Sequence, residues 1–179
     1  MLVLDALNKF GKDVQAGAKL QLRQQNKNTS KQLSKSVKFE TKVSKNSFKL
    51  SFFMEDYGKF VDQGVKGIGG SRADGTPYKK KKVDASSPFK YKKGIENKPS
   101  RKHFDKWSVQ KGIAGRNKKG QFLTRIGLTS AISQIVWHEG LKTTNFFTKP
   151  FEKEFKELPD ELTEAYGLDV ENLLKFSLK

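Results

Sequence analysis

Closely spaced glycines and a histidine–glutamate pair come nearest to a known chemical motif in this chain. A phosphate-binding loop of the form Gly-x-Gly-x-x-Gly would need a third glycine after Gly67 and Gly69, but Arg72 stands at that position. The pair His138 and Glu139 would begin a zinc-protease helix only if a second histidine followed three residues after the glutamate, where a lysine stands. The sequence therefore predicts no catalytic residue, no cofactor and no metal ion here.

A nuclease site is a further, more distant alternative. The chain has two histidines, and His103 lies close in sequence to Asp105, so these two residues and His138 could be imagined as a metal-assisted pair or triad. Nothing in the spacing fixes their proximity, and a histidine on or near the surface is the simpler interpretation. We expect the protein not to be an enzyme.

The positive charge is concentrated in the middle of the chain. Residues 66–125 contain 18 Lys and Arg against four Asp and Glu, whereas residues 1–65 have a net charge of +6 and residues 126–179 a net charge of −3. Such a field favours an anionic partner: nucleic acid, a membrane surface or an acidic protein face. The alternative is a lysine-rich surface that is simply solvated.

Aromatic residues alternate with the lysines of this region, as they do in proteins that bind single strands. Tyr78 precedes a run of four lysines, and Phe89 and Tyr91 precede two more. The cations that could contact phosphate or protein are Lys79, Lys80, Lys81, Lys82, Lys92 and Lys93. Lysines contact phosphates without specifying bases, so the composition supports non-specific backbone contact at most. The aromatic residues could equally anchor a loop to a neighbouring subunit.

Other classes of protein are disfavoured by what the chain lacks. It has no cysteine, which excludes disulfides and thiolate zinc sites. It has no run of 18 apolar residues, so we expect a soluble protein without a membrane partner. The first residues lack the basic region of a secretory signal.

Hydrophobic periodicity predicts helices and a hairpin in the N-terminal third. Leu4, Leu7, Val14, Ala18 and Leu22 recur near helical spacing, which predicts a helix over 2–26. Two alternating runs predict strands, with apolar faces formed by Val37, Phe39, Thr41 and Val43 and by Phe48, Leu50, Phe52 and Met54. Residues 44–47 have the length of a hairpin loop. A short helix over 56–63 follows and ends at Gly64.

Residues 64–100 show no helical or strand periodicity, and we expect them to form an extended, partly mobile loop. A short helix over 101–113 would turn Phe104, Trp107 and Ile113 toward a core, and a second strong helix is predicted over 123–139. Residues 140–148 favour a strand or an extended connection. Pro150 suits the first turn of a helix to about Leu158. Pro159, Asp160 and Glu161 are predicted to begin the last helix, with the two carboxylates near the positive end of its dipole. Its continuation over 167–178 is either helical or docks on a neighbour.

These elements predict an α+β fold. A small antiparallel sheet would be covered by the helices near 2–26 and 123–139, because a lone hairpin is barely stable. We expect a single domain over 1–179, with residues 65–122 as a basic arm and residues 159–179 as a C-terminal helical tail.

The order of these segments resembles the neck and tail-completion proteins of tailed bacteriophages. In that family a segment like YGKFVDQG at 57–64 follows the hairpin, and a segment like NFFTKPF at 145–151 opens the C-terminal helix. Segments such as TPY at 76–78, WSVQKG at 107–112 and GQF at 120–122 are similar to versions with a long basic insertion. The motif residues are Tyr57, Phe60, Val61, Gly64, Phe146, Phe147 and Pro150.

The resemblance implies a structural virion protein that forms a ring in the neck and joins the portal and head to the tail around the DNA path. Its partners would be copies of itself, the portal and other neck or tail proteins, with phage DNA as a non-specific contact of the basic arm. It would be made in the cytoplasm of the host bacterium. The alternative is a stand-alone, non-specific nucleic-acid-binding protein. The insertion is longer than in the compact members of the family, which leaves open which ring is formed.

Overall fold

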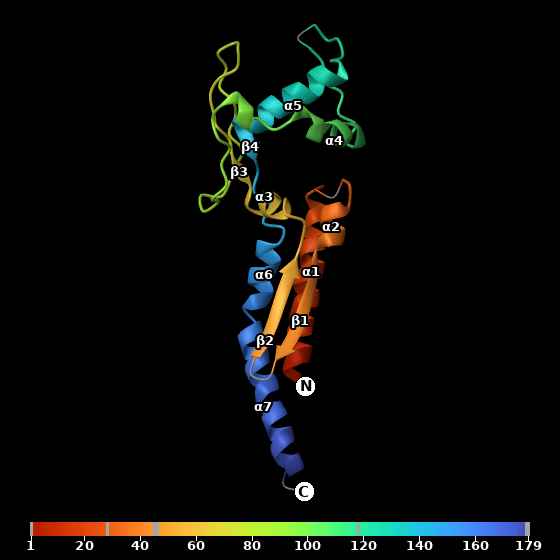
Figure 1. Cartoon of the computed structure of the whole chain (residues 1–179), viewed down its shortest axis with the longest axis vertical. Coiled ribbons are helices and arrows are strands. Elements are labelled where there is room, and N and C mark those ends of the chain that lie inside the picture. The colour runs from red at the N-terminus through yellow and green to blue at the C-terminus, as the bar shows by residue number, and fades with distance from the viewer. Residues whose placement is uncertain (1, 28, 45–46, 118, 178–179) are drawn as a thin grey trace. The chain divides into compact units, whose positions relative to one another are not determined.

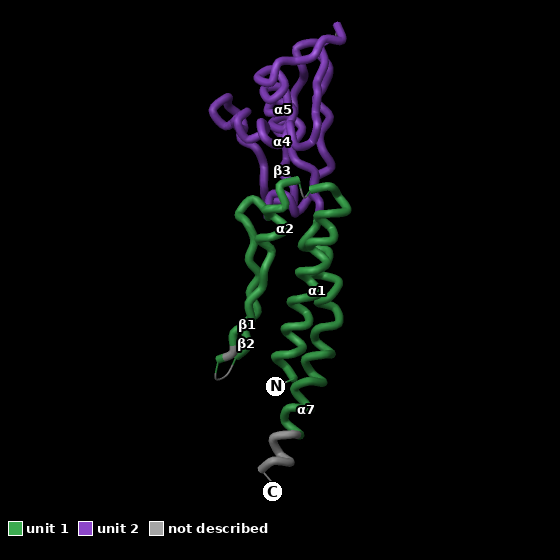
Figure 2. The backbone as a smooth tube through the Cα atoms, turned by 90° about the vertical axis from the view of Figure 1, so that its right-hand side faces the viewer, with its two compact units in different colours: residues 1–58, 145–179 green, residues 59–144 purple. Residues whose placement is uncertain are grey.

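The computed structural model describes residues 2–27, 29–44, 47–117 and 119–177, with the side chains of residues 43 and 172–177 outside the described set. The chain divides into two compact units (Figure 2). Unit 1 comprises Met1–Gly58 and Asn145–Lys179, and unit 2 comprises Lys59–Thr144. The sequence predicted a single domain with residues 65–122 as an arm; in the structure these residues lie inside unit 2, together with residues 59–64 and 123–144.

Unit 1 is built on a long N-terminal helix, as predicted. Helix α1 (Leu2–Gln24) buries one face at Val3, Leu7, Phe10, Gly11, Val14, Ala18 and Leu22. These positions recur every three or four residues, so they form one apolar stripe along the helix. A short helix α2 (Gln32–Ser36) follows and buries Leu33.

The predicted hairpin is confirmed. Strands β1 (Lys38–Ser44) and β2 (Ser47–Phe53) pair antiparallel, with Phe39 opposite Phe52 and Thr41 opposite Leu50. Because these pairs are in register, the apolar residues of both strands share one face. Residues 45–46 of the predicted loop lie outside the described residues.

Two C-terminal helices complete unit 1. Helix α6 (Thr148–Phe155) and helix α7 (Leu158–Ser177) pack on α1, as the views of Figures 1 and 2 also show. Asp160 and Glu161 lie in the first turn of α7, as predicted. Asp169 of α7 accepts hydrogen bonds from the backbone N–H groups of Leu2 and Val3 at 3.1 and 3.3 Å, so it caps the start of α1. Position 178 of the predicted tail lies outside the described residues.

The core of unit 1 is a set of phenylalanine rings from four elements. Phe10 of α1 meets Phe52 of β2 and Phe151 of α6 with ring centroids 6.2 and 5.6 Å apart. Leu158 and Ala165 of α7 close the same cluster. The prediction that residues 123–139 cover the hairpin is therefore wrong: α1 and the C-terminal helices cover it. Both 123–139 and the C-terminal helices carry apolar residues, and sequence periodicity does not say which of them meets the sheet.

Unit 2 contains short elements joined by irregular segments. They are α3 (Gly58–Gln63), β3 (Val65–Lys66), η1 (Ile95–Asn97), η2 (Arg101–Phe104), α4 (Asp105–Gln110), α5 (Arg125–Glu139) and β4 (Gly140–Leu141). Strands β3 and β4 pair antiparallel. Helix α5 confirms the helix predicted over 123–139, and it packs on η2 and α4.

The fold class is α+β, as the sequence predicted. Helices make up most of the regular structure, and the two antiparallel sheets have two strands each. None of the helices, over the residues described, is both long and apolar enough to span a bilayer.

Candidate interaction surface

The first predicted motif, residues 57–64, contributes mainly to the interior of unit 2. Phe60 of α3 lies edge-on to Phe89 with ring centroids 4.6 Å apart, and the Lys59 ammonium lies 5.4 Å from the Phe60 ring. The carbonyl of Val61 accepts a hydrogen bond from Thr144 Oγ1 at 2.7 Å. These contacts hold α3 to the segments around residues 89 and 144.

Gly64 ends α3 in a conformation that a larger residue would not adopt easily. Its φ is +76°, and a Cβ placed there would come within 2.7 Å of the Leu141 carbonyl and the Thr143 amide. The Ser87 hydroxyl donates to the Gly64 carbonyl at 2.9 Å. The glycine predicted as a helix terminator is thus also a point of close backbone approach to β4.

Tyr57, which precedes α3, belongs to unit 1 and remains exposed. Partial burial raises the pKa of its phenol, and the carboxylate of Glu55 adds to the effect. Of the seven motif residues, it is the only one classed as exposed in the described structure. Its ring is therefore the motif side chain best placed to meet a partner.

The second predicted motif, residues 145–151, belongs to unit 1 and contributes Phe146 and Pro150 to its buried interior. Phe146 is fully buried, and the Phe147 ring lies 5.3 Å from that of Phe52. Pro150 is buried in α6, and a Cβ added at Gly17 would lie 2.8 Å from its ring. Since a fully buried side chain cannot touch a partner of the folded chain, Phe146 acts through the fold.

The basic arm is tied down by a buried carboxylate. Glu139, at the end of α5, is 5% exposed and forms ion pairs with Lys81 at 2.9 Å and with Arg72 at 3.2 Å. The Lys81 amide also donates to the Glu139 carbonyl at 2.8 Å. A charge this deeply buried is stable only when it is paired and hydrogen-bonded, so Glu139 requires both cations.

Aromatic stacking extends this attachment. The Tyr78 and His138 rings stack in parallel at 4.2 Å, and the Arg72 guanidinium lies 4.8 Å from the Tyr78 ring. His138 has hydrogen bonds at both ring nitrogens, to Gln134 at 2.7 Å and to the Gly69 carbonyl at 2.5 Å. Residues 69, 72, 78 and 81 of the segment predicted to be an extended, partly mobile loop are therefore held to α5, at His138 and Glu139.

Three of the other predicted lysines, Lys82, Lys92 and Lys93, are attached through their backbone carbonyls and present their side chains to solvent. The Lys82 carbonyl accepts from the Thr143 amide at 3.2 Å, and the Lys92 carbonyl accepts from Trp137 Nε1 at 3.0 Å. The Lys93 carbonyl accepts from Asn97 Nδ2 at 2.8 Å. The exposed lysines are Lys79, Lys80, Lys81, Lys82, Lys92 and Lys93. Basic charge is thus displayed from a fixed backbone.

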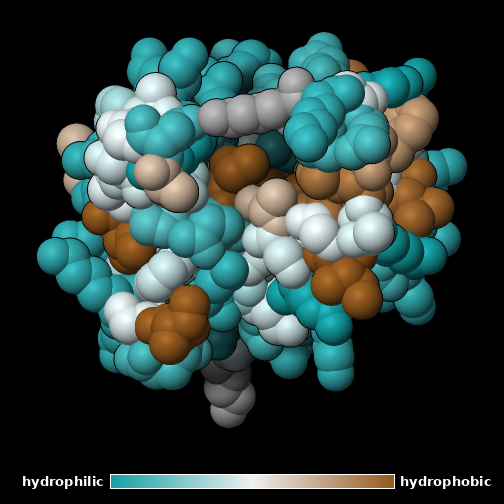
Figure 3. All heavy atoms as spheres, turned by 90° about the horizontal axis from the view of Figure 1, so that it is seen from above, coloured by the Kyte–Doolittle hydropathy of each residue, from teal (hydrophilic) through white to brown (hydrophobic). Residues whose placement is uncertain are grey.

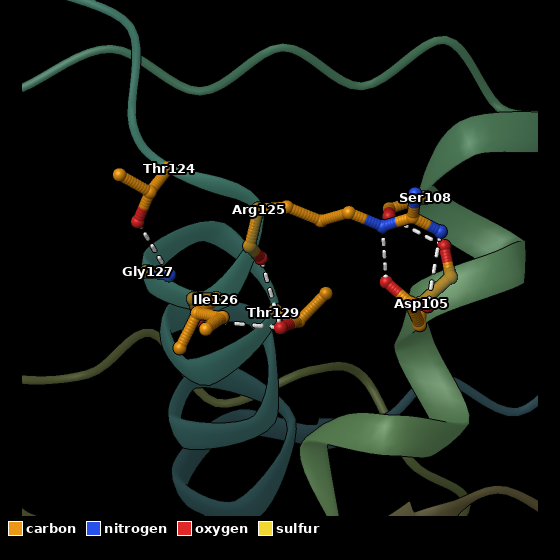
Figure 4. A network of polar contacts seen from close by, with 7 residues as sticks. All are labelled: Asp105, Ser108, Thr124, Arg125, Ile126, Gly127 and Thr129. Carbon is orange, nitrogen blue, oxygen red and sulfur yellow. Dashed lines mark hydrogen bonds and ion pairs between the residues drawn. The ribbon is translucent and has the colours of Figure 1, made fainter.

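A hollow of about 430 Å³ lies between η2, α4 and the start of α5. Its lining residues are Arg101, Lys102, Asp105, Arg125, Ile126 and Thr129. We call this set the α4–α5 face. Arg125 Nε and Nη2 donate to the two carboxylate oxygens of Asp105 at 2.5 and 2.9 Å (Figure 4). The hydrogen bond and charge of Arg125 lower the pKa of Asp105, so the pair stays charged at neutral pH.

Local hydrogen bonds fix the start of α5. The Thr124 hydroxyl accepts from the Gly127 amide at 3.2 Å and caps the helix, and the Thr129 hydroxyl donates to the Arg125 carbonyl at 3.0 Å (Figure 4). The α4–α5 face carries three cations, Arg101, Lys102 and Arg125, and one acid, Asp105. Excess positive charge beside an apolar Ile126 suits an anionic protein segment or a phosphate.

Large apolar side chains of unit 2 are exposed, and they include Trp107 at 38%, Phe122 at 63% and Ile126 at 62%. Seen from above, the surface of the molecule is mostly hydrophilic with hydrophobic patches (Figure 3). The prediction that Trp107 and Ile113 turn toward the core is wrong, because both are exposed. Alternation of Lys and Arg with single apolar residues over 101–126 was the available signal for such a surface.

The suggested nuclease residues are engaged elsewhere. Asp105 pairs with Arg125, His138 stacks on Tyr78, and His103 is exposed in η2. Within the described part of the chain, no hydrogen bond or ion pair joins any two of them. None of the three comparisons, with protein families, with curated proteins and with solved structures, finds a match for this chain.

Proposed function

We propose that this chain is a structural, non-enzymatic subunit of a tailed-bacteriophage virion. It would form a ring in the neck that joins the portal and head to the tail around the DNA path. It would be made in the cytoplasm of the host bacterium, with copies of itself, the portal and other neck or tail proteins as partners. The resemblance of the two motifs and of the segment order supports this role.

The observation that carries the proposal is the surface of unit 2. This unit has 20 Lys and Arg against six Asp and Glu, yet it exposes Trp107, Val109, Phe122 and Ile126. Large exposed apolar side chains on a strongly basic unit would supply a surface for association with another protein. A ring subunit needs two different surfaces that meet head to tail, and such a surface would supply one of them.

Binding of nucleic acid is the second candidate function. It is favoured by the exposed lysines of the basic arm, which are presented from a fixed backbone. Their contacts would be to phosphates and therefore independent of sequence, and affinity would fall steeply with salt. In a neck ring the same lysines could contact DNA that passes through.

Sizing by light scattering, combined with negative-stain imaging, tests the main proposal. We expect closed rings, either of the purified chain or after addition of purified portal complexes. Binding to duplex and single-stranded DNA, measured between 50 mM and 200 mM salt, tests the second candidate. A strict monomer that also ignores portal complexes would contradict the main proposal, and tight, steeply salt-dependent DNA binding by that monomer would favour the second.

A further inference from the structure

We infer that the outward face of α7 binds the α4–α5 face of a second copy of this chain. This inference rests on the proposed ring, because it names the contact that would join neighbouring subunits. The supporting observation is that the two surfaces have opposite charge and that each has exposed apolar residues.

The α7 surface is strongly acidic. Residues 157–171 contain six Asp and Glu and no Lys, Arg or His. One side of the helix packs in unit 1, where Leu158 and Ala165 are buried and Asp169 caps α1. At about 100° per residue, positions 160, 164, 167 and 171 lie on the opposite side, and Asp160, Glu164, Gly167 and Glu171 are all exposed there. We call these four residues the α7 outer stripe.

Two carboxylates of the α7 outer stripe, those of Asp160 and Glu164, face solvent. Over the described residues, neither Asp160 nor Glu164 forms an ion pair, whereas Glu161, on the flank of the helix, pairs with Lys9. Apolar side chains border the stripe: Tyr166 is 65% exposed, and Leu168 and Val170 are exposed as well. A partner surface with cations and an apolar hollow would pair with the carboxylates and bury the apolar side chains.

Gly167 lies in the middle of the stripe, and no contact within the described part of the chain requires a glycine there. A Cβ added there meets nothing within 4 Å, and the residue is helical, so neither crowding nor a positive φ requires it. A glycine inside a helix lowers helix stability relative to alanine. Because glycine has no side chain, the backbone of another helix can approach it closely, as it does at helix–helix contacts.

The α4–α5 face has the complementary features. Residues 101–126 contain eight Lys and Arg against one acid, Asp105, whose carboxylate is occupied by Arg125. Arg101 and Lys102 line the hollow together with the exposed Ile126. An acidic helix could place carboxylates on Arg101 and Lys102, with Val170 or Tyr166 against Ile126. The apolar contact made by Ile126 would exclude water, and this would strengthen the neighbouring ion pairs.

A second copy is the occupant that this complementarity favours. Each chain carries one α7 outer stripe and one α4–α5 face, and these are different surfaces. A contact between different surfaces is head to tail, so repeating it builds a ring when the rotation closes. Other acidic proteins or a nucleic-acid phosphate would meet the α4–α5 face without using α7.

Charge reversal on each surface tests the inference. We expect Asp160→Lys with Glu164→Lys, and separately Arg101→Glu with Lys102→Glu, each to weaken self-association at least about tenfold at low salt. Mixing the two defective variants should restore assembly, because the reversed stripe of one then meets the reversed face of the other. The matched controls are Glu152→Lys on α6 and Lys90→Glu in unit 2, both at exposed positions, and they should assemble like the parent chain.

A variant at Gly167 provides an independent test if charge reversal disturbs folding. Gly167→Leu should leave the circular-dichroism spectrum and thermal transition of the subunit intact or improved, yet reduce assembly at least about tenfold. Assembly is measured for the full chain alone and on portal complexes. Rings that form equally well with both reversed pairs and with Gly167→Leu would overturn this inference and leave the proposed neck function standing. A parent chain that never associates would overturn both.

Discussion

The two units of this chain are stabilised in opposite ways. Among the residues whose side chains the structure describes, thirteen hydrophobic residues are buried: eleven lie in unit 1, and Val65 and Trp137 lie in unit 2. The seven buried polar or charged residues of the same described set belong to unit 2: Asp62, Ser87, Ser108, Thr129, Ser133, Glu139 and Thr144. Unit 1 depends on packing of apolar side chains, and unit 2 depends on hydrogen bonds and ion pairs that fix irregular backbone.

The charge distribution follows the same division. Unit 1 has 16 Lys and Arg against 13 Asp and Glu, a net charge of +3, whereas unit 2 has a net charge of +14. Lysines are expensive to bury, so a strongly basic segment cannot build a large apolar core. Unit 2 instead uses a few buried polar groups as attachment points and leaves its apolar side chains partly exposed. The comparison teaches that an irregular basic segment can be ordered without a large core.

Removing a core ring should give the largest effect and confine it to unit 1. We expect Phe146→Ala to lower the free energy of unfolding by about 3 to 5 kcal/mol, because the ring is fully buried and a cavity would remain. Urea unfolding followed by circular dichroism measures the loss. Phe155→Ala, at a ring that is half exposed, is the matched control and should cost much less. Equal losses for the two variants would contradict the packing account of unit 1.

Replacing the glycine at the end of α3 should give the next largest effect, in unit 2. Gly64→Ala would force a side chain into a positive φ and against the Leu141 carbonyl, and we expect a loss of about 2 to 3 kcal/mol. Hydrogen exchange of the β3–β4 amides reports it. Gly75→Ala is the control, because its φ is also positive but nothing lies within 4 Å of the added Cβ. A larger loss at Gly75 would show that crowding is not the cause.

Neutralising the buried carboxylate of unit 2 should release the basic arm. We expect Glu139→Gln to cost about 1 to 2 kcal/mol, a value reduced because Lys81 and Arg72 are partly exposed and can be solvated. Trypsin should then cut faster after Lys79 to Lys82. Glu152→Gln, at an exposed acid of unit 1, should leave the cleavage rate unchanged. Unchanged cleavage in Glu139→Gln would contradict the role of this carboxylate as the attachment point.

The smallest expected effect concerns the cap that α7 provides for α1. Hydrogen bonds from the Leu2 and Val3 amides lower the pKa of Asp169, so its contribution to stability is present above the carboxyl's ordinary pKa of about 4 and is lost as pH falls through the lower, folded-state pKa. We expect Asp169→Asn to lower the melting temperature slightly at pH 7, and by less as the pH falls below the carboxyl's ordinary pKa. A difference that grows on acidification would contradict the cap. Melting curves between pH 2 and pH 7 measure it.

Local patterns were sufficient for several elements. The helical spacing of Leu7, Val14 and Leu22 located α1, and alternation located β1 and β2 with the observed facing residues. These predictions succeed because a helix stripe and a strand face are set by residues a few positions apart. The placement of Asp160 and Glu161 in the first turn of α7 succeeded for the same reason.

Those local patterns did not show which helices and strands, distant in sequence, pack against one another. The helix over 123–139 was assigned to the hairpin, but α6 and α7 pack there with α1. Trp107 and Ile113 were assigned to a core, and both are exposed. Apolar periodicity identifies a face that tends to be buried without identifying what covers it.

The sequence by itself determined the α+β class, the N-terminal helix and hairpin, and the concentration of positive charge over residues 66–125, because composition and short periodicities depend only on neighbours along the chain. The tertiary structure decided that this basic segment is ordered. Glu139 is 58 residues from Lys81 in sequence, and only folding brings its carboxylate within 2.9 Å of that ammonium. A buried charge must find its partners in space, and no local pattern specifies them.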